Sequence, residues 1–175
     1  MFNGVQLITA IDDVLKNSGY VSDMGITVPD VRAIYFVKKP LVLKVRNLCA
    51  FIDLPEIIVD PKTAREYFEF VRKCLMQKYG DAFLWKELEL CFIVFCEDAS
   101  FKMLKVEGDK VVQKASFELN AMLGTFFINK TNYDVILQST WGLHFSGQHL
   151  TALKDQVFTW CNKQKESIED NRPNI

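Results

Sequence analysis

The two histidines of the chain, His144 and His149, lie close together and follow Trp141. Histidine is the side chain whose unperturbed charge changes between pH 5 and 8, so any mechanism that needs such a base has only these two to use. His144 follows a predicted strand end, and His149 falls in the first turn of a predicted helix. Loops at strand ends often carry functional groups, so Trp141, His144 and His149 form one candidate binding constellation. In the structural alternative, Trp141 closes the core, His144 pairs along its loop and His149 faces solvent.

Two adjacent carboxylates, Glu97 and Asp98, directly follow an apolar run that ends at Cys96. Carboxylates at a strand end can bind a metal ion or divide acid and base roles, because burial raises one pKa and a neighbouring charge separates the two. Glu97, Asp98 and His144 would form a metal-assisted hydrolytic site if they converged in space. Alternatively, Asp98 caps a following helix and the pair performs no chemistry.

Motifs for the commoner kinds of catalysis are missing from the sequence. The eight glycines form neither Gly-x-Gly-x-x-Gly nor a Walker loop, and no Gly-x-Ser-x-Gly or His-Glu-x-x-His occurs. The cysteines form no Cys-x-x-Cys pair, and each lies in an apolar run, as reduced cysteine does when it packs as a small hydrophobe. We therefore expect no catalytic residue, no metal, no cofactor and a cytoplasmic location. The five cysteines are Cys49, Cys74, Cys91, Cys96 and Cys161.

Basic and acidic residues nearly balance, at 21 and 22, and they are interspersed. A nucleic-acid binder usually carries a basic face, because phosphate contacts dominate its affinity. The densest basic positions, Lys38-Lys39 and Lys44 with Arg46, flank a predicted strand turn, so we expect no nucleic-acid partner. No stretch approaches the ~20 apolar residues of a membrane span. The first residues also lack the basic and apolar regions of a secretory signal, so we expect neither feature.

Two elements that must position the candidate residues have clear signatures. Asp60 is a typical helix N-cap, Pro61 suits the first helical position, and a strongly periodic apolar face follows as far as about Gly80. Residues 88–96 predict a strand that is buried on both faces. The apolar face of the helix comprises Ala64, Tyr67, Phe68, Val71, Cys74 and Leu75.

The remaining segments have weaker signals. Residues 97–115 are predicted to form a helix, with a hairpin around Gly108-Asp109 as the alternative. Further elements are a helix over 3–18 ended by Gly19, an exposed connection over 19–30, two strands over 31–37 and 41–54, a hairpin of 115–128 with 133–140, and a last helix capped by Ser146.

Apolar residues make up 49% of the 175 residues and include fourteen phenylalanines, enough to bury a large core. We expect one globular domain over 1–175, with an N-terminal helix and loop over 1–30 and a frayed tail over 166–175. The element order predicts the α+β class, with a mixed or antiparallel-rich sheet of about five strands packed by two or three helices. Eight of the phenylalanines either pack in this core, line an apolar pocket, or form an oligomer interface if they are exposed. They are Phe92, Phe95, Phe101, Phe117, Phe126, Phe127, Phe145 and Phe158.

The expected function is that of a soluble, non-catalytic cytosolic module that binds a protein partner or a small apolar ligand, either alone or as a homodimer. Its candidate binding residues are Glu97, Asp98, Trp141, His144 and His149. The alternative is a small metal-assisted hydrolase that uses Glu97, Asp98 and His144.

Overall fold

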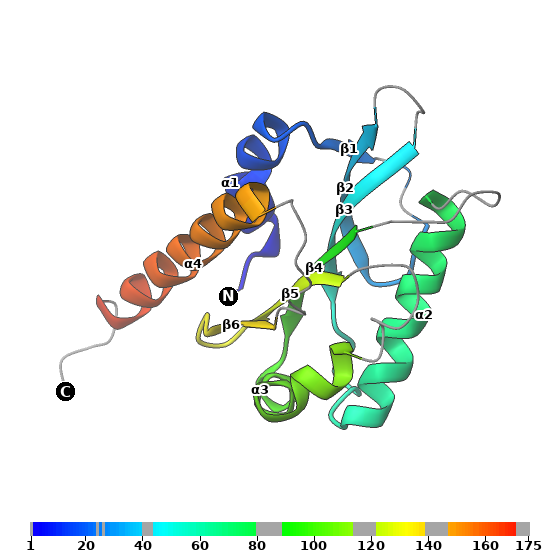
Figure 1. The fold of residues 1–175 in the computed structure, drawn as a ribbon. Helices are drawn as coiled ribbons and strands as arrows, with labels where there is room; N and C mark the ends of the chain where they lie inside the picture. The colour runs from blue at the N-terminus through cyan, green and yellow to red at the C-terminus, as the bar shows by residue number, and fades with distance from the viewer. Residues whose placement is uncertain are drawn as a thin grey trace, which may run out of the picture.

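The computed structural model describes residues 2–23, 25, 27–39, 44–79, 89–113, 122–138 and 147–170. Six strands form one sheet, and their spatial order is also their order in the sequence. Figure 1 shows this sheet between two pairs of helices. The strands are β1 (Val21–Asp23), β2 (Val31–Lys39), β3 (Lys44–Asp53), β4 (Glu89–Cys96), β5 (Met122–Asn129) and β6 (Val135–Gln138).

The sheet is mixed in direction. β3, β4 and β5 are parallel, whereas the β1–β2, β2–β3 and β5–β6 pairs are antiparallel. Parallel neighbours need a crossover connection, and here α2 (Pro61–Tyr79) and α3 (Asp98–Gln113) provide the two crossovers. The three parallel strands therefore end at a common edge, which we call the carboxyl edge.

Helices cover both faces of the sheet. α2 and α3 pack on one face, while α1 (Gly4–Asn17) and α4 (Gly147–Asp170) pack on the other (Figure 1). The α+β class with a mixed sheet is confirmed, and the described residues contain six strands and four helices. The sequence predicted about five strands and two or three helices. The helix predicted within 97–115 is the fourth helix, α3, and β1 is the sixth strand. Among the described residues, no helix has the length and apolar character needed to cross a membrane.

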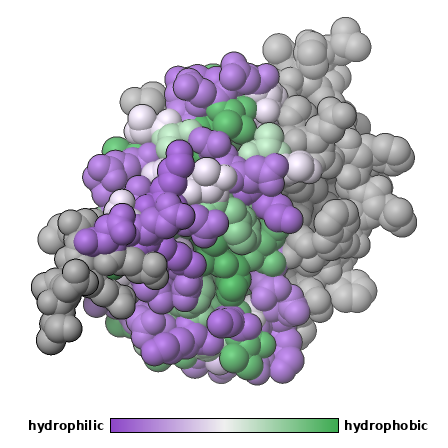
Figure 2. Space-filling model, turned by 90° about the vertical axis from the view of Figure 1, so that its left-hand side faces the viewer, coloured by the Kyte–Doolittle hydropathy of each residue, from purple (hydrophilic) through white to green (hydrophobic). Residues whose placement is uncertain are grey.

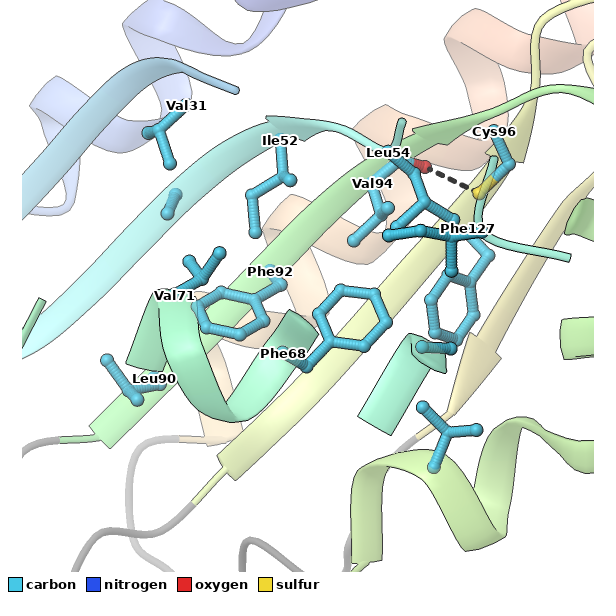
Figure 3. Packing of buried hydrophobic residues seen from close by; sticks show 14 of the residues in the cluster. Val31, Ile52, Leu54, Phe68, Val71, Leu90, Phe92, Val94, Cys96 and Phe127 are labelled. Carbon is cyan, nitrogen blue, oxygen red and sulfur yellow. Dashed lines mark hydrogen bonds between the residues drawn. The ribbon is translucent and has the colours of Figure 1, made fainter. Parts of the chain in front are cut away.

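β4 divides its side chains between two cores. Phe92 and Val94 face α2 and α3, whereas Ile93 and Phe95 face α1 and α4. This alternation confirms that the strand predicted over 88–96 is buried on both faces. Figure 3 shows Phe68 of α2 against the sheet; its ring centroid lies 6.3 Å from that of Phe92 and 6.0 Å from that of Phe127.

Local sequence signals set several helix ends. Asp60 Oδ1 accepts hydrogen bonds from the backbone N–H groups of Lys62 and Thr63, each over 3.0 Å, so Asp60 caps α2 as predicted. Gly19 has a φ of +82° just after α1, a conformation that glycine adopts without strain.

Two segments differ from their predictions. β1 lies within residues 19–30, which were predicted to be an exposed connection. The frayed tail predicted over 166–175 is wrong for its first five residues, because α4 continues through Glu166 to Asp170.

The side of the molecule that carries α1 and α4 is mainly hydrophilic. Figure 2 shows this side, with most apolar atoms confined to a narrow stripe between polar ones. Phe158 of α4 and Val135 and Leu137 of β6 are partly buried against the core beneath these helices. The described part of this surface thus has the pattern expected of amphipathic helices on a sheet.

Candidate functional site

The structure places both Glu97 and Asp98 at the carboxyl edge, where Glu97 connects β4 to α3 and Asp98 begins α3. Glu97 Oε1 lies 3.0 Å from Lys130 Nζ. Asp98 Oδ2 lies 2.6 Å from Lys102 Nζ, and Asp98 Oδ1 accepts a hydrogen bond from Asn129 Nδ2 over 3.0 Å. The bonds from Lys102 and then Asn129 hold the pKa of Asp98 below its usual value. The two adjacent carboxylates therefore face different partners.

Asp98 also has a structural role in α3. It is the first residue of this helix, where a carboxylate is stabilised by the helix dipole. The backbone N–H of Phe101 donates to Glu97 O over 2.9 Å, so Glu97 precedes the helix and accepts its first backbone bond. Glu97 thus occupies the capping position that the alternative assigned to Asp98, and Asp98 is instead the first residue of the helix.

The other candidate residues from the sequence are described only in part. Trp141 and His144 lie outside the described residues. His149 falls in the first turn of α4, as predicted, but its side chain lies outside the described part. Convergence of Glu97, Asp98 and His144 on one metal ion stays a prediction.

A network of ion pairs crosses the carboxyl edge from β2 to the turn after β5. Arg32 Nε donates to Asp53 Oδ2. Lys130 Nζ lies 3.8 Å from Asp53 Oδ1 and 3.0 Å from Glu97 Oε1. We call Arg32, Asp53, Lys130 and Glu97 the edge ion network. Its two positive charges equal its two negative charges in number, so the network has no net charge.

Sequence reasoning missed three of the four residues in this network. Asp53, Lys130 and Arg32 come from separate segments, and the pairing of β2 with β3, β3 with β4 and β4 with β5 brings them together. A usable signal existed, because parallel strands end at one edge and Asp53, Glu97 and Lys130 each lie at a strand end. Using it required knowing that the strands were parallel.

Two backbone irregularities position Arg32. Val31 pairs with Ile52 and Ala33 with Phe51, so Arg32 is the extra residue of a β-bulge. Bulges redirect side chains and occur often beside functional sites. Asp30 has a φ of +60°, and its backbone carbonyl accepts a hydrogen bond from Asp53 N over 2.8 Å. The bulge and this turn together bring the guanidinium of Arg32 to the end of β3.

A second feature of the carboxyl edge is the turn after β3, residues 55–60, which we call the Ile57 turn. The backbone N–H of Ile58 donates to Pro55 O over 3.0 Å and closes a β-turn. Ser100 Oγ in α3 donates to Ile58 O over 2.7 Å, and Leu54 N donates to Phe95 O over 3.0 Å. Bonds to β4 and α3 thus hold this turn.

Three consecutive apolar residues of the Ile57 turn have contrasting environments. Ile58 is 3% exposed and packs in the core with α2 and α3, whereas Ile57 is 81% exposed and Val59 is 51% exposed. Ile57 is the most exposed large apolar side chain in the described part of the chain. Residue type alone does not predict which of the three side chains is buried, because all three are aliphatic and β-branched. The anchoring of Ile58 is what turns its two neighbours outward.

Three of the described thiols, those of Cys49, Cys96 and Cys161, are poorly suited to nucleophilic chemistry. Burial raises the pKa values of Cys96 and Cys161 to about 12, although Lys130 acts in the opposite direction at Cys96. The hydrogen bond that the Cys49 thiol shares with Cys91 as donor, and then burial, raise the pKa of Cys49 well above its usual value. Since the thiolate is the reactive form, the raised pKa values disfavour reaction of Cys49, Cys96 and Cys161 at neutral pH.

The described phenylalanines that were considered as pocket lining belong to the cores. Phe92, Phe95, Phe101, Phe126 and Phe127 are buried among other apolar side chains. Phe158 is partly buried, and two further candidates, Phe117 and Phe145, lie outside the described residues. Over the described ranges, no three histidine, cysteine or acidic side chains are grouped as a metal site requires.

These features define an α+β protein with a mixed sheet, a neutral ion network and an anchored apolar turn at one edge. No protein-family model, curated protein or solved structure matches this chain.

Proposed function

We propose that the chain is a non-catalytic binding module that recognises another protein. The observation that carries this proposal is the pairing of charges at the carboxyl edge. Glu97 pairs with Lys130, Asp98 with Lys102, and Arg32 with Asp53. A catalytic acid or base must reach the proton that it transfers, whereas these groups are engaged with one another and suit a fixed recognition surface.

A protein partner has more support than a small apolar ligand. The candidate lining phenylalanines that the structure describes are mostly packed in the cores, whereas large apolar side chains project outward at the Ile57 turn. Protein interfaces commonly combine an apolar centre with a polar rim. The edge ion network and the Ile57 turn lie at the same end of the sheet and provide these two components.

A cytoplasmic location is part of the proposal. All five cysteines are free thiols. Reduced thiols are typical of the cytosol, where disulfides are rare.

The metal-assisted hydrolase has less support. Glu97 and Asp98 are held by different lysines, and their carboxylates would both have to leave these partners to share an ion. A hydrolase would cleave p-nitrophenyl esters or phosphates in the presence of Mg²⁺ or Zn²⁺, and Glu97→Gln would abolish this turnover. We expect no turnover above background in either form.

Reconstitution with purified components tests the binding proposal. Partners are captured by chemical cross-linking in the source cells, identified, and produced separately. Light scattering and calorimetry should then detect a complex of defined stoichiometry between the chain and one of these purified proteins. The proposal is overturned if no purified candidate binds and the chain is a bare monomer, or if the hydrolase assay gives Glu97-dependent turnover.

A further inference from the structure

We propose that the Ile57 turn is the docking element, and that it inserts Ile57 and Val59 into an apolar pocket rimmed by basic residues on a partner protein. This inference rests on the proposed binding function and adds the surface and the chemistry of the partner. Its basis is the combination of exposure, anchoring and charge at residues 55–60.

The exposure of the turn is concentrated. Ile57 and Val59 are 81% and 51% exposed and lie two positions apart on one loop. Among the residues whose exposure the structure describes, each of the other exposed large apolar side chains is alone on its element. Single exposed apolar residues are ordinary on protein surfaces. These others are Val5 of α1, Val21 of β1, Phe70 of α2, Val106 of α3 and Ile168 of α4.

The turn is held in shape before any partner binds. Ile58 is buried, its N–H closes the turn to Pro55 O, and its carbonyl accepts from Ser100 Oγ. Asp60 fixes the other end by capping α2. A loop that is already ordered loses little conformational entropy on association, so more of the contact energy of Ile57 contributes to affinity.

Charge determines the kind of partner. Glu56 and Asp60 are exposed on either side of Ile57 and Val59, and neither forms an ion pair within the described ranges. Facing lysines or arginines would complement these carboxylates and steer association. A second copy of the chain that docks turn to turn is disfavoured, because two such turns would bring like charges together. An anionic lipid surface is disfavoured for the same reason.

Peptide display provides the test. A random peptide library is selected on the immobilised wild-type chain and, in parallel, on the Ile57→Ser, Val59→Ser double variant. We expect the wild type to enrich peptides that combine apolar with basic residues. Affinities of the enriched peptides, measured by calorimetry, should fall about tenfold or more in the double variant, because burying one aliphatic side chain contributes more than the ~1.4 kcal/mol that corresponds to tenfold.

Two further variants make the test specific. Val106→Ser removes a side chain that is 77% exposed on α3 and should leave the affinities unchanged. Glu56→Lys should weaken binding and reduce its dependence on salt. Circular dichroism and thermal unfolding of each variant separate loss of binding from loss of fold.

The outcomes distinguish this inference from the function on which it rests. If wild type and double variant bind the enriched peptides equally, or if the peptides are acidic, the docking element is wrong while a binding function survives. If no peptide is enriched on the wild type and no purified partner binds, both proposals fail. Self-association that the double variant abolishes would overturn the choice of a different protein as partner.

Discussion

Asn129 Nδ2 donates a hydrogen bond to Asp98 Oδ1 over 3.0 Å and so joins the end of β5 to the first turn of α3. Asn129 Oδ1 also accepts from the backbone N–H of Thr131 over 2.8 Å. The Asn129 side chain is 1% exposed, so water cannot easily replace either bond. This residue holds the turn from which Lys130 reaches the edge ion network.

Substituting Asn129 should therefore destabilise the carboxyl edge. We expect Asn129→Ala to lower the free energy of unfolding by about 1–3 kcal/mol, the usual cost of leaving buried polar groups without partners. Asn129→Asp should be at least as harmful at neutral pH, because it places a second carboxylate against Asp98. Urea titrations at neutral and acidic pH measure both effects. A loss below about 0.5 kcal/mol for the alanine variant would contradict this role.

Two phenylalanines on α2 provide a matched pair. Phe68 packs against Phe92 and Phe127, whereas Phe70 is 48% exposed on the same helix. Phe68→Ala should cost about 3–5 kcal/mol because it opens a cavity in the core. Phe70→Ala should cost far less, within about 1 kcal/mol. Urea denaturation of the two variants compares these costs, and equal costs would show that the helix face is assigned wrongly.

The lowered pKa of Asp23 should make the free energy of unfolding depend on pH in the acidic range. A hydrogen bond from Tyr79, then one from the Gly25 backbone N–H, then Lys78 lower the pKa of Asp23 to about 2 from 3.8. Because the folded-state pKa is depressed, this stabilisation is present above about pH 4 and is lost as the pH falls toward 2. Asp23→Asn should flatten the pH dependence of the unfolding free energy in that window.

Tyr79→Phe tests the cause of this shift. It removes the largest contribution, so the folded-state pKa of Asp23 should rise toward 3.8, and the acid-dependent loss of stability should become smaller and end at a higher pH. Urea titrations between about pH 2 and 5 locate both windows. An Asp23→Asn variant with the same acid dependence as the wild type would contradict the assignment.

Thiol labelling should distinguish one cysteine from the others. Cys49, Cys91, Cys96 and Cys161 are buried, whereas Cys74 is partly exposed on α2. Iodoacetamide at neutral pH should modify Cys74 first, and the other four should react only after unfolding. Mass spectrometry of tryptic peptides measures the order. Cys74→Ser should remove the early modification, and rapid labelling of Cys96 in the folded chain would contradict its burial.

Much of the fold could be predicted from local patterns. The Asp60-Pro61 signal identified α2, and the unbroken apolar run identified β4 as a central strand. β1 could not be predicted, because its three residues have no apolar alternation and depend on pairing with β2. The hairpin alternative around Gly108 is wrong, because α3 continues through that position, where the glycine packs against Gln138 of β6.

The candidate site was harder to predict than the fold. Glu97 and Asp98 were identifiable because they follow a recognisable strand. Asp53 and Lys130 were not, since only parallel pairing brings the ends of β3, β4 and β5 together. The different exposures of Ile57, Ile58 and Val59 depend on one anchored turn, which no periodic pattern describes.

The sheet order has a consequence for how the chain folds. Each strand pairs only with its neighbours in sequence, so no strand has to insert between two that are already paired. The sheet can therefore grow outward in the order in which the ribosome delivers its strands. α4, in contrast, packs against an element that is distant in sequence. Gln156 Nε2 of α4 donates a hydrogen bond to Ala10 O of α1. The core between the sheet and α1 therefore remains partly exposed until α4 is synthesised. Nascent chains that lack α4 should expose this apolar surface and bind chaperones.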